Sequence, residues 1–177
     1  MLVVFVVGRK SLFPNPVTIG EFSLPELSGW KRKTSTSPKS SIVFYYQKHG
    51  TAELLIRFGT KANSANVTQK TVQDLQKEET QRYREMAVKM TKGEQKFQWS
   101  SPELATLNSI PAVRMRSVTF NSSQTQYIEQ WRFIKSAHLY GLTSTIAVPP
   151  TNSPTPPTEY QRELNGAMKK IIDSLVD

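Results

Sequence analysis

Cysteine is absent from this sequence, and histidine occurs only twice. Without cysteine the chain has no disulfides, no Cys-ligated zinc, no iron–sulfur cluster and no thiol nucleophile. His49 and His138 are far apart and do not form an H-E-x-x-H motif, so we expect no metal site and no cofactor. We interpret His49 as a solvated residue at a hairpin tip and His138 as a structural residue at the start of a strand.

The glycine motifs that hold phosphates are missing as well. The sequence has no P-loop and no G-x-G-x-x-G, and none of its serines stands in G-x-S-x-G. Nothing in it brings Glu53 and Glu129 together as the carboxylate pair of a glycosidase. We therefore do not expect an enzyme. One alternative stays open, an enzyme without a recognisable motif, and a deep pocket containing His138 and converging carboxylates would favour it.

Negative charge is scarce relative to positive charge, and the formal net charge is +9. Residues 1–60 carry eight Lys or Arg against three Asp or Glu, so more than half of the excess lies there. A local basic patch of this kind favours an acidic partner. We interpret the segment 30–41, WKRKTSTSPKSS, as a mobile surface loop. Its functional alternative is docking on an acidic protein or on lipid head groups.

The length of 177 residues suits one domain with a core of its own. We assign residues 17–177 to that domain and residues 1–16 to an N-terminal extension. The extension contains MLVVFVV, which is too short to span a bilayer. It is interpreted either as a strand or as the remnant of an export signal. In the second case the natural start lies upstream and the protein is exported to a periplasm or thylakoid lumen; otherwise we expect it in the cytoplasm.

Apolar residues that alternate with polar ones predict most of the strands. Ile19, Phe22 and Leu24 alternate until Pro25 ends the run. Two runs at 41–50 and 51–59 are typical of a hairpin that turns near His49 and Gly50. Further strands are predicted at 112–120, 125–136 and 137–148, with an edge strand near 94–99. The prolines of 149–157 exclude sheet pairing there, so that segment is predicted to be a stiff loop.

Two helices are predicted from apolar residues at three- and four-residue spacing. The first runs from about 68 to about 90, is capped by Asn66 or Thr68, and has Glu79 interrupting its apolar stripe. The second begins at Thr158, which forms a capping-box signature with Gln161. Strands, a long helix, more strands and a final helix indicate the α+β class. We expect an antiparallel sheet with the long central helix and the C-terminal helix packed on it.

The order of these segments resembles the PsbP/DcrB/Mog1-like group, in particular small bacterial DcrB-type domains. FSLPELSGWK is similar to the opening strand of that group, and AELLIRF to its next strand. LNSIPAVRMRSVTF and YIEQWRFIKSAHLYGLTSTIAV resemble its later strands, and the ending IIDSLV resembles the end of its C-terminal helix. The resemblance covers residues 17–176 and rests on hydrophobic patterns, so it is specific for fold and weak for function.

The resemblance implies an α/β/α sandwich of the PsbP/Mog1 type and a function in binding other proteins. Members include photosystem II subunits, a nuclear-import factor, envelope lipoproteins and the Eag chaperones of type VI secretion effectors. We therefore expect a non-enzymatic, protein-binding accessory protein, associated with the envelope or with a photosystem. An Eag-like chaperone, which would be a homodimer with an apolar groove, is the alternative.

The expected partner is another protein with an acidic surface, and a membrane surface is the second possibility. Arg114 and Arg116 lie two residues apart on one strand and so share a face, and we expect Arg132 of the next strand to join them. Exposed arginines and aromatics also occur in single-strand binders, but no nucleic-acid signature is present and we do not expect that partner. The residues predicted to bind the partner are Lys31, Arg32, Lys33, Arg114, Arg116, Trp131 and Arg132.

Overall fold

The computed structural model describes residues 16–37, 40–61, 71–90 and 96–175. The MLVVFVV run and the remainder of 1–15 lie outside the described residues. The described elements, in chain order, are β1 (Val17–Ile19), β2 (Phe22–Leu24), β3 (Lys31–Ser37), β4 (Ser40–His49), β5 (Ala52–Lys61), α1 (Val72–Met90), β6 (Lys96–Trp99), β7 (Glu103–Leu107), β8 (Ile110–Phe120), β9 (Thr125–Lys135), β10 (His138–Val148) and α2 (Thr158–Asp173). Among these residues, neither helix is both long and apolar enough to cross a membrane.

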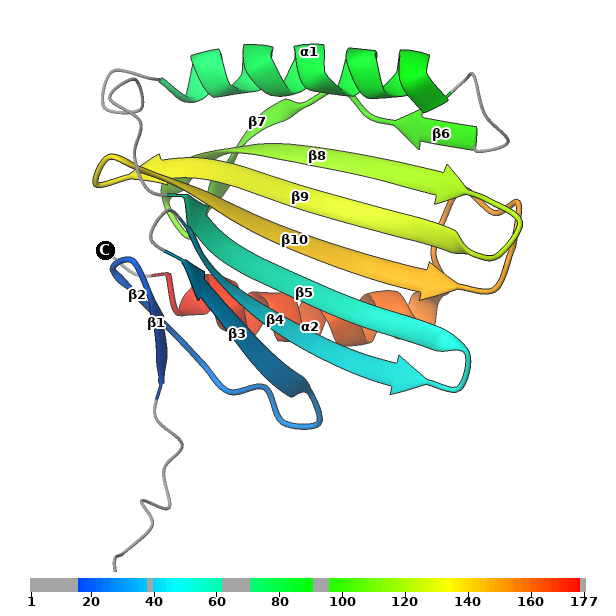
Figure 1. Ribbon diagram of the computed structural model, residues 1–177, viewed down its shortest axis with the longest axis horizontal. Coiled ribbons are helices and arrows are strands. Elements are labelled where there is room, and N and C mark those ends of the chain that lie inside the picture. Colours follow the sequence, from blue (N-terminus) through cyan, green and yellow to red (C-terminus); the bar gives the residue numbers. More distant parts are fainter. Residues whose placement is uncertain (1–15, 38–39, 62–70, 91–95, 176–177) are drawn as a thin grey trace, which may run out of the picture.

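One large antiparallel sheet organises the chain (Figure 1). Its strand order is β3-β4-β5-β10-β9-β8-β6, and β7 pairs with the part of β8 that β6 leaves free. The long strands β8, β9 and β10 follow one another as a meander, as the alternating runs predicted. A small hairpin of β1 and β2 packs beside the sheet through Ile19, Phe22 and Leu24.

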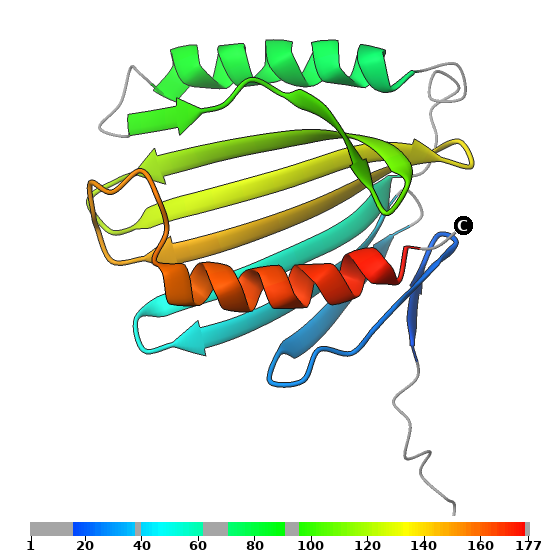
Figure 2. The same ribbon diagram turned by 180° about the vertical axis from the view of Figure 1, so that it is seen from behind.

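The helices lie against opposite faces of the sheet. The helix α2 crosses β5 and β10 on the face seen in Figure 2, where Leu164, Met168 and Ile171 are buried. The helix α1 packs on the other face along β6, β7, β8 and β9, with Leu75 and Tyr83 against Met115. Burial of each of these apolar side chains stabilises the fold by about 1.5–3 kcal/mol. The apolar stripes of the two helices therefore hold the sheet between them. The α+β sandwich is thereby confirmed.

The second helix begins at Thr158 as predicted, but its capping is different. Asn66 and Thr68 lie outside the described residues. At the described start of α1, the backbone N–H of Asp74 donates to the Thr71 hydroxyl at 3.2 Å, and the Thr71 backbone N–H donates to the Asp74 carboxylate at 3.0 Å. This reciprocal pair forms a capping box. The capping box predicted for α2 is wrong, because Pro157 is the N-cap residue and makes no side-chain cap bond.

The predicted Gln161 partner of that second box is used elsewhere. Its side-chain amide donates to Asn165 at 2.8 Å, one turn further along α2. Its backbone N–H donates to the Pro157 carbonyl at 3.1 Å and so closes the first helical turn. Proline fits at this boundary because its missing N–H would have no helical partner.

The segment 30–41 contains a strand, so its interpretation as a loop is wrong. Residues Lys31–Ser37 form β3, which pairs with β4 from Lys31 opposite Tyr46 to Ser37 opposite Ser40. An edge strand has only one pairing side, so it tolerates a polar sequence, and its lysines oppose pairing with a further chain. The short strand β7 was not predicted. The predicted hairpin turn at Gly50 is confirmed, with φ at +61°.

Candidate functional site

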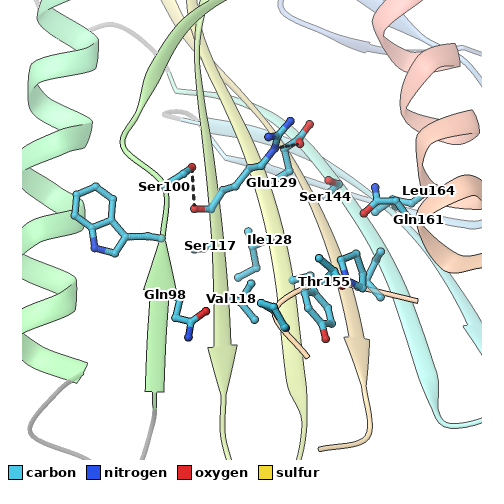
Figure 3. Close-up of a pocket in the computed structure, with 16 residues that line it drawn as sticks. Gln98, Ser100, Ser117, Val118, Ile128, Glu129, Ser144, Thr155, Gln161 and Leu164 are labelled. Carbon is cyan, nitrogen blue, oxygen red and sulfur yellow. Dashed lines mark hydrogen bonds and ion pairs between the residues drawn. The ribbon is translucent and has the colours of Figure 1, made fainter. Parts of the chain in front are cut away.

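A groove lies beside α2, where that helix leaves β8 and β9 uncovered. It has a volume of about 400 Å³, which is within the range of small-molecule sites. Figure 3 shows its residues converging between β6 on one side and α2 on the other. Half of the lining residues are polar or charged, and Ser144, Thr155 and Gln98 contribute hydroxyl and amide groups. The apolar and aromatic lining residues are Trp99, Val118, Tyr127, Ile128, Ile146, Pro154, Pro156 and Leu164.

One end of the groove carries a charged cluster centred on Glu129. One carboxylate oxygen accepts hydrogen bonds from Arg114 at 2.8 Å and from Arg116 at 2.9 Å. The other oxygen accepts the Trp131 indole N–H at 3.0 Å. Burial of the carboxylate opposes ionisation, but the two arginines outweigh it and hold the pKa of Glu129 below its ordinary value. The charges of this cluster are therefore already paired within the protein.

The structure places Trp131 in the core rather than at the surface. Only 8% of it is exposed, and the Arg114 guanidinium lies 5.0 Å from the centre of its ring. Its indole orients the Glu129 carboxylate, as described above. Its role as a binding hot spot stays a prediction, and this geometry gives it little exposed area to offer a partner.

The expectation that Arg132 joins Arg114 and Arg116 is wrong. Arg114 pairs with Trp131, while Arg132 pairs with Val113, so the side chain of Arg132 lies on the α1 side of the sheet. There its Nε lies 3.8 Å from a carboxylate oxygen of Glu79. Burial of the guanidinium lowers the pKa of Arg132, an effect that Glu79 opposes.

A second surface, which we call the basic face, lies on the α1 side over β3, β4 and β5, beyond the strands that α1 covers. It consists of Lys31, Lys33, Phe44, Tyr46 and Arg57. Residues directly opposite in an antiparallel ladder share a face. Lys31 is opposite Tyr46, Lys33 is opposite Phe44, and Phe44 is opposite Arg57.

Cations and aromatic rings alternate on this basic face. The Lys31 ammonium lies 5.8 Å from the centre of the Tyr46 ring, and the Arg57 guanidinium lies 5.9 Å from that of Phe44. Tyr46 is 39% exposed. Arg32, the third residue predicted in this segment, points to the opposite face and pairs with Glu26 at 3.2 Å. The alternation of β3 thus separates it from the two lysines.

Comparison with solved structures identifies the fold. The chain is similar to cyanobacterial PsbP (CyanoP) from Synechocystis, with a TM-score of 0.52 over 86% of this chain and 84% of that one, at 10% sequence identity. The fold is PsbP-like. The chain is also similar to LpqN, a protein involved in cell envelope biogenesis of Mycobacterium tuberculosis, with a TM-score of 0.47 at 12% identity, over 86% of this chain and 80% of LpqN.

No protein-family model matches the chain, and no curated protein matches it. At these low identities the likeness to PsbP concerns the fold, so no binding residue can be carried over. The predicted fold group is confirmed by this likeness and by the sheet with its two helices.

The histidines of this PsbP-like domain have structural surroundings. His49 is not simply solvated, because its Nε2 lies 2.9 Å from a Glu163 carboxylate oxygen and its ring lies 5.8 Å from Tyr160, both on α2. His138 is the first residue of β10, as the sequence predicted, and its Nδ1 lies 2.8 Å from the Ser136 carbonyl oxygen. Neither histidine lines the groove. In the described part of the chain, no three metal-binding side chains gather.

Sequence reasoning did not find the polar network on the α1 side. Glu79, only 8% exposed, accepts a hydrogen bond from Arg82 Nε at 2.6 Å. The Gln130 carbonyl oxygen accepts from Arg82 at 3.1 Å and from the Tyr83 hydroxyl at 3.0 Å. The sequence contained one indication of this network, which was Glu79, a charged residue inside the apolar stripe of the first helix.

Proposed function

We propose that this protein is a non-enzymatic accessory protein that binds an acidic region of another protein through its basic face. One observation carries the proposal. Lys31 and Lys33 of β3 and Arg57 of β5 lie on the same side of the sheet, next to the exposed ring of Tyr46. Among the described residues, the helix that contacts this part of the sheet is α2, which lies on its opposite side, so the basic face is not covered by a helix (Figure 2).

Charge on this surface is one-sided. On the α1 side of β3, β4 and β5, the one described acidic side chain is Glu53, which pairs with Lys48 at 2.7 Å. On the other face, the two positive charges of Arg114 and Arg116 are instead balanced by the carboxylates of Glu129 and Glu103. An excess of positive charge steers an acidic partner and favours it over a neutral one.

Aromatic rings beside the cations give the surface contact area as well as charge. Tyr46 is more than one third exposed and is held by strand β4, so little conformational entropy is lost when it is covered. Aromatic residues with few rotamers are common at the centres of protein interfaces. The expected interface therefore has Tyr46 near its centre, flanked by Lys31 and Lys33.

The surroundings of the titratable groups support a binding role over catalysis. The groove beside α2 has a single carboxylate among its described lining residues, Glu129, and both of its oxygens are engaged by Arg114, Arg116 and Trp131. A general base needs a free acceptor within reach of a substrate.

The test compares two charge-matched double variants. Lys31→Gln/Lys33→Gln removes two positive charges from the basic face, and Lys169→Gln/Lys170→Gln removes two from exposed positions of α2. The tagged proteins capture partners from native lysate, and the partner identified is purified and titrated by calorimetry. Two exposed charges contribute about 1–2 kcal/mol together, so the first variant should bind about 5- to 30-fold more weakly.

The proposal predicts that the captured partner is acidic, that binding weakens as salt rises, and that only the first variant loses affinity. Equal affinity of both variants for the purified partner would refute the assignment to the basic face. If both variants keep binding the partner, and a substitution by a larger side chain in the groove beside α2 abolishes binding, the site lies on the other face.

The Eag-like chaperone is the second candidate function, and one observation favours it. Half of the residues that line the groove beside α2 are apolar or aromatic, and these could shield an apolar segment. It predicts a homodimer, which sedimentation at micromolar concentration checks. A monomer that does not protect an apolar peptide would contradict it. Association with an envelope or photosystem stays part of the proposal, and localisation of the full-length gene product tests it.

A further inference from the structure

A second pocket lies on the α1 side, between the basic face and α1. Its volume is about 350 Å³, and its floor is formed by β5 and β10, where Gly59 and Gly141 are directly paired. Arg57 and Arg132 both line it, together with Gln130 and Thr143, and no Asp or Glu is among its described lining residues. We call it the arginine pocket.

The glycine at 141 lets an arginine lie flat on the sheet. A side chain there would place its Cβ 2.4 Å from Nη1 of Arg132, so the guanidinium occupies the space above Gly141. Arg132 starts on β9 and thus extends over β10 toward β5, which carries Arg57. The second glycine, Gly59, has no side chain to fill the neighbouring part of the pocket.

Among the described residues, the positive charge in this region exceeds the negative charge that pairs with it. The charges of Arg57 and Arg82 both lower the pKa of Arg132, whereas the carboxylate of Glu79, which pairs with Arg82 and Arg132, raises it. Glu79 is held by Arg82 at hydrogen-bond distance, while Arg132 Nε lies 3.8 Å away and makes no hydrogen bond within the described part of the chain. The pocket therefore offers excess positive charge to a ligand.

The remaining lining groups favour an oxyanion over other anions. The Gln130 carbonyl oxygen already accepts two bonds, from Arg82 and Tyr83, which leaves its side-chain N–H group to donate. Thr143 adds a hydroxyl from β10. Guanidinium groups match the geometry of phosphate and bind it with two parallel N–H···O bonds.

We infer that the arginine pocket binds a phosphate monoester, held by Arg57, Arg132 and Gln130, with the rest of the ligand over the floor at Gly59. The volume exceeds the needs of one phosphate and is in the range of small-molecule sites. A soluble phosphate ester and a lipid with a monoester head group share this chemistry. The inference does not depend on the acidic partner proposed above.

Inorganic phosphate is the first probe, titrated at constant ionic strength into the ¹⁵N-labelled full chain. The backbone amides of Gly59 and Gly141 and the side-chain amide of Gln130 report binding locally. We expect saturable shifts at these three groups. Arg57→Gln should weaken binding about 10-fold or more, because a charge-assisted pair is lost. Arg57 is exposed, so this variant should fold normally.

The matched control is Arg162→Gln, which removes the same charge from an exposed position of α2 on the opposite face. It should bind phosphate like the unchanged protein, and so should Lys31→Gln/Lys33→Gln, which separates this site from the proposed docking surface. Absence of saturable shifts up to millimolar phosphate, or equal weakening by Arg162→Gln and Arg57→Gln, would overturn the inference.

Vesicles distinguish the two sources of the phosphate. Phosphatidylcholine vesicles with and without phosphatidic acid, which has a monoester head group, are used in flotation. Binding to phosphatidic acid that Arg57→Gln loses and Arg162→Gln retains would assign the pocket to a lipid. Phosphate binding by the soluble probe, with no flotation, would assign it to a soluble ester.

Discussion

Replacing Glu79 by glutamine is the most informative perturbation of the α1 side. The substitution Glu79→Gln keeps the shape of the side chain and one acceptor oxygen but removes the charge that faces Arg82 and Arg132. Glu79 is 8% exposed, so its charge acts where solvent screens it little.

The expected cost follows from how buried the two arginines are. Removing one partner of a fully buried ion pair costs about 3–5 kcal/mol. Here the Arg82 side chain is 41% exposed and that of Arg132 is 30% exposed, so water compensates part of the loss. The retained amide oxygen also still accepts a hydrogen bond from the Arg82 guanidinium, and this bond is weaker than the one to a carboxylate by about 1 kcal/mol. We therefore expect Glu79→Gln to lower the free energy of unfolding by about 2 kcal/mol.

Urea unfolding followed by circular dichroism measures this change. The control is Glu85→Gln, which lies on an exposed part of the same helix, accepts a hydrogen bond from Gln81, and should cost less than about 0.5 kcal/mol. Equal stability of the two variants would refute the reasoning that Glu79 joins α1 to the sheet. Phosphate affinity adds a second readout, because loss of this carboxylate should strengthen binding in the arginine pocket if the protein stays folded.

Two further predictions concern the groove beside α2. Because the pKa of Glu129 is lowered in the folded protein, its ionised form stabilises the fold above the ordinary carboxyl value of 4.5, and this stabilisation is lost as the pH falls through the lower folded value. The stability difference between the unchanged protein and Glu129→Gln should therefore be present at pH 7 and shrink below pH 4.5, as urea titrations at several pH values will show; a difference independent of pH would contradict the assignment. Trp131→Ala removes a ring that is 8% exposed and should lower the free energy of unfolding by about 3 kcal/mol, measured by thermal or urea unfolding. If the variant were as stable as the unchanged protein but no longer bound the protein partner, Trp131 would be a binding residue after all.

Most elements of this fold were predictable because their signals are local. The run around Gly50 combines alternating apolar residues with a turn residue, and the β4–β5 hairpin forms there. The stripe of α2 likewise predicted the burial of Leu164 and Ile171. The failures also have local causes. The polar sequence of β3 carries no apolar alternation, and only pairing with β4 makes it a strand.

The candidate sites were less predictable, because they depend on neighbours that are distant in the sequence. Taken separately, Gly59 and Gly141 are residues that weaken strands. Their direct pairing, with Arg132 lying over one of them, becomes visible only in the folded sheet. The contacts of Glu129 with Arg114 and Arg116 likewise required the pairing of β8 with β9, which brings both arginines to the same carboxylate.

The sequence by itself determined the α+β class, the excess of positive charge, and the two faces of β9, because the pleat of a strand alternates side chains whatever its surroundings. The tertiary structure decided which residues of neighbouring strands share a face. Arg132 was expected beside Arg114 and Arg116, but strand register places it across from Val113 and under α1. Register depends on turn geometry and on the packing of both faces together, so a shift of one residue would exchange the two sets of arginines.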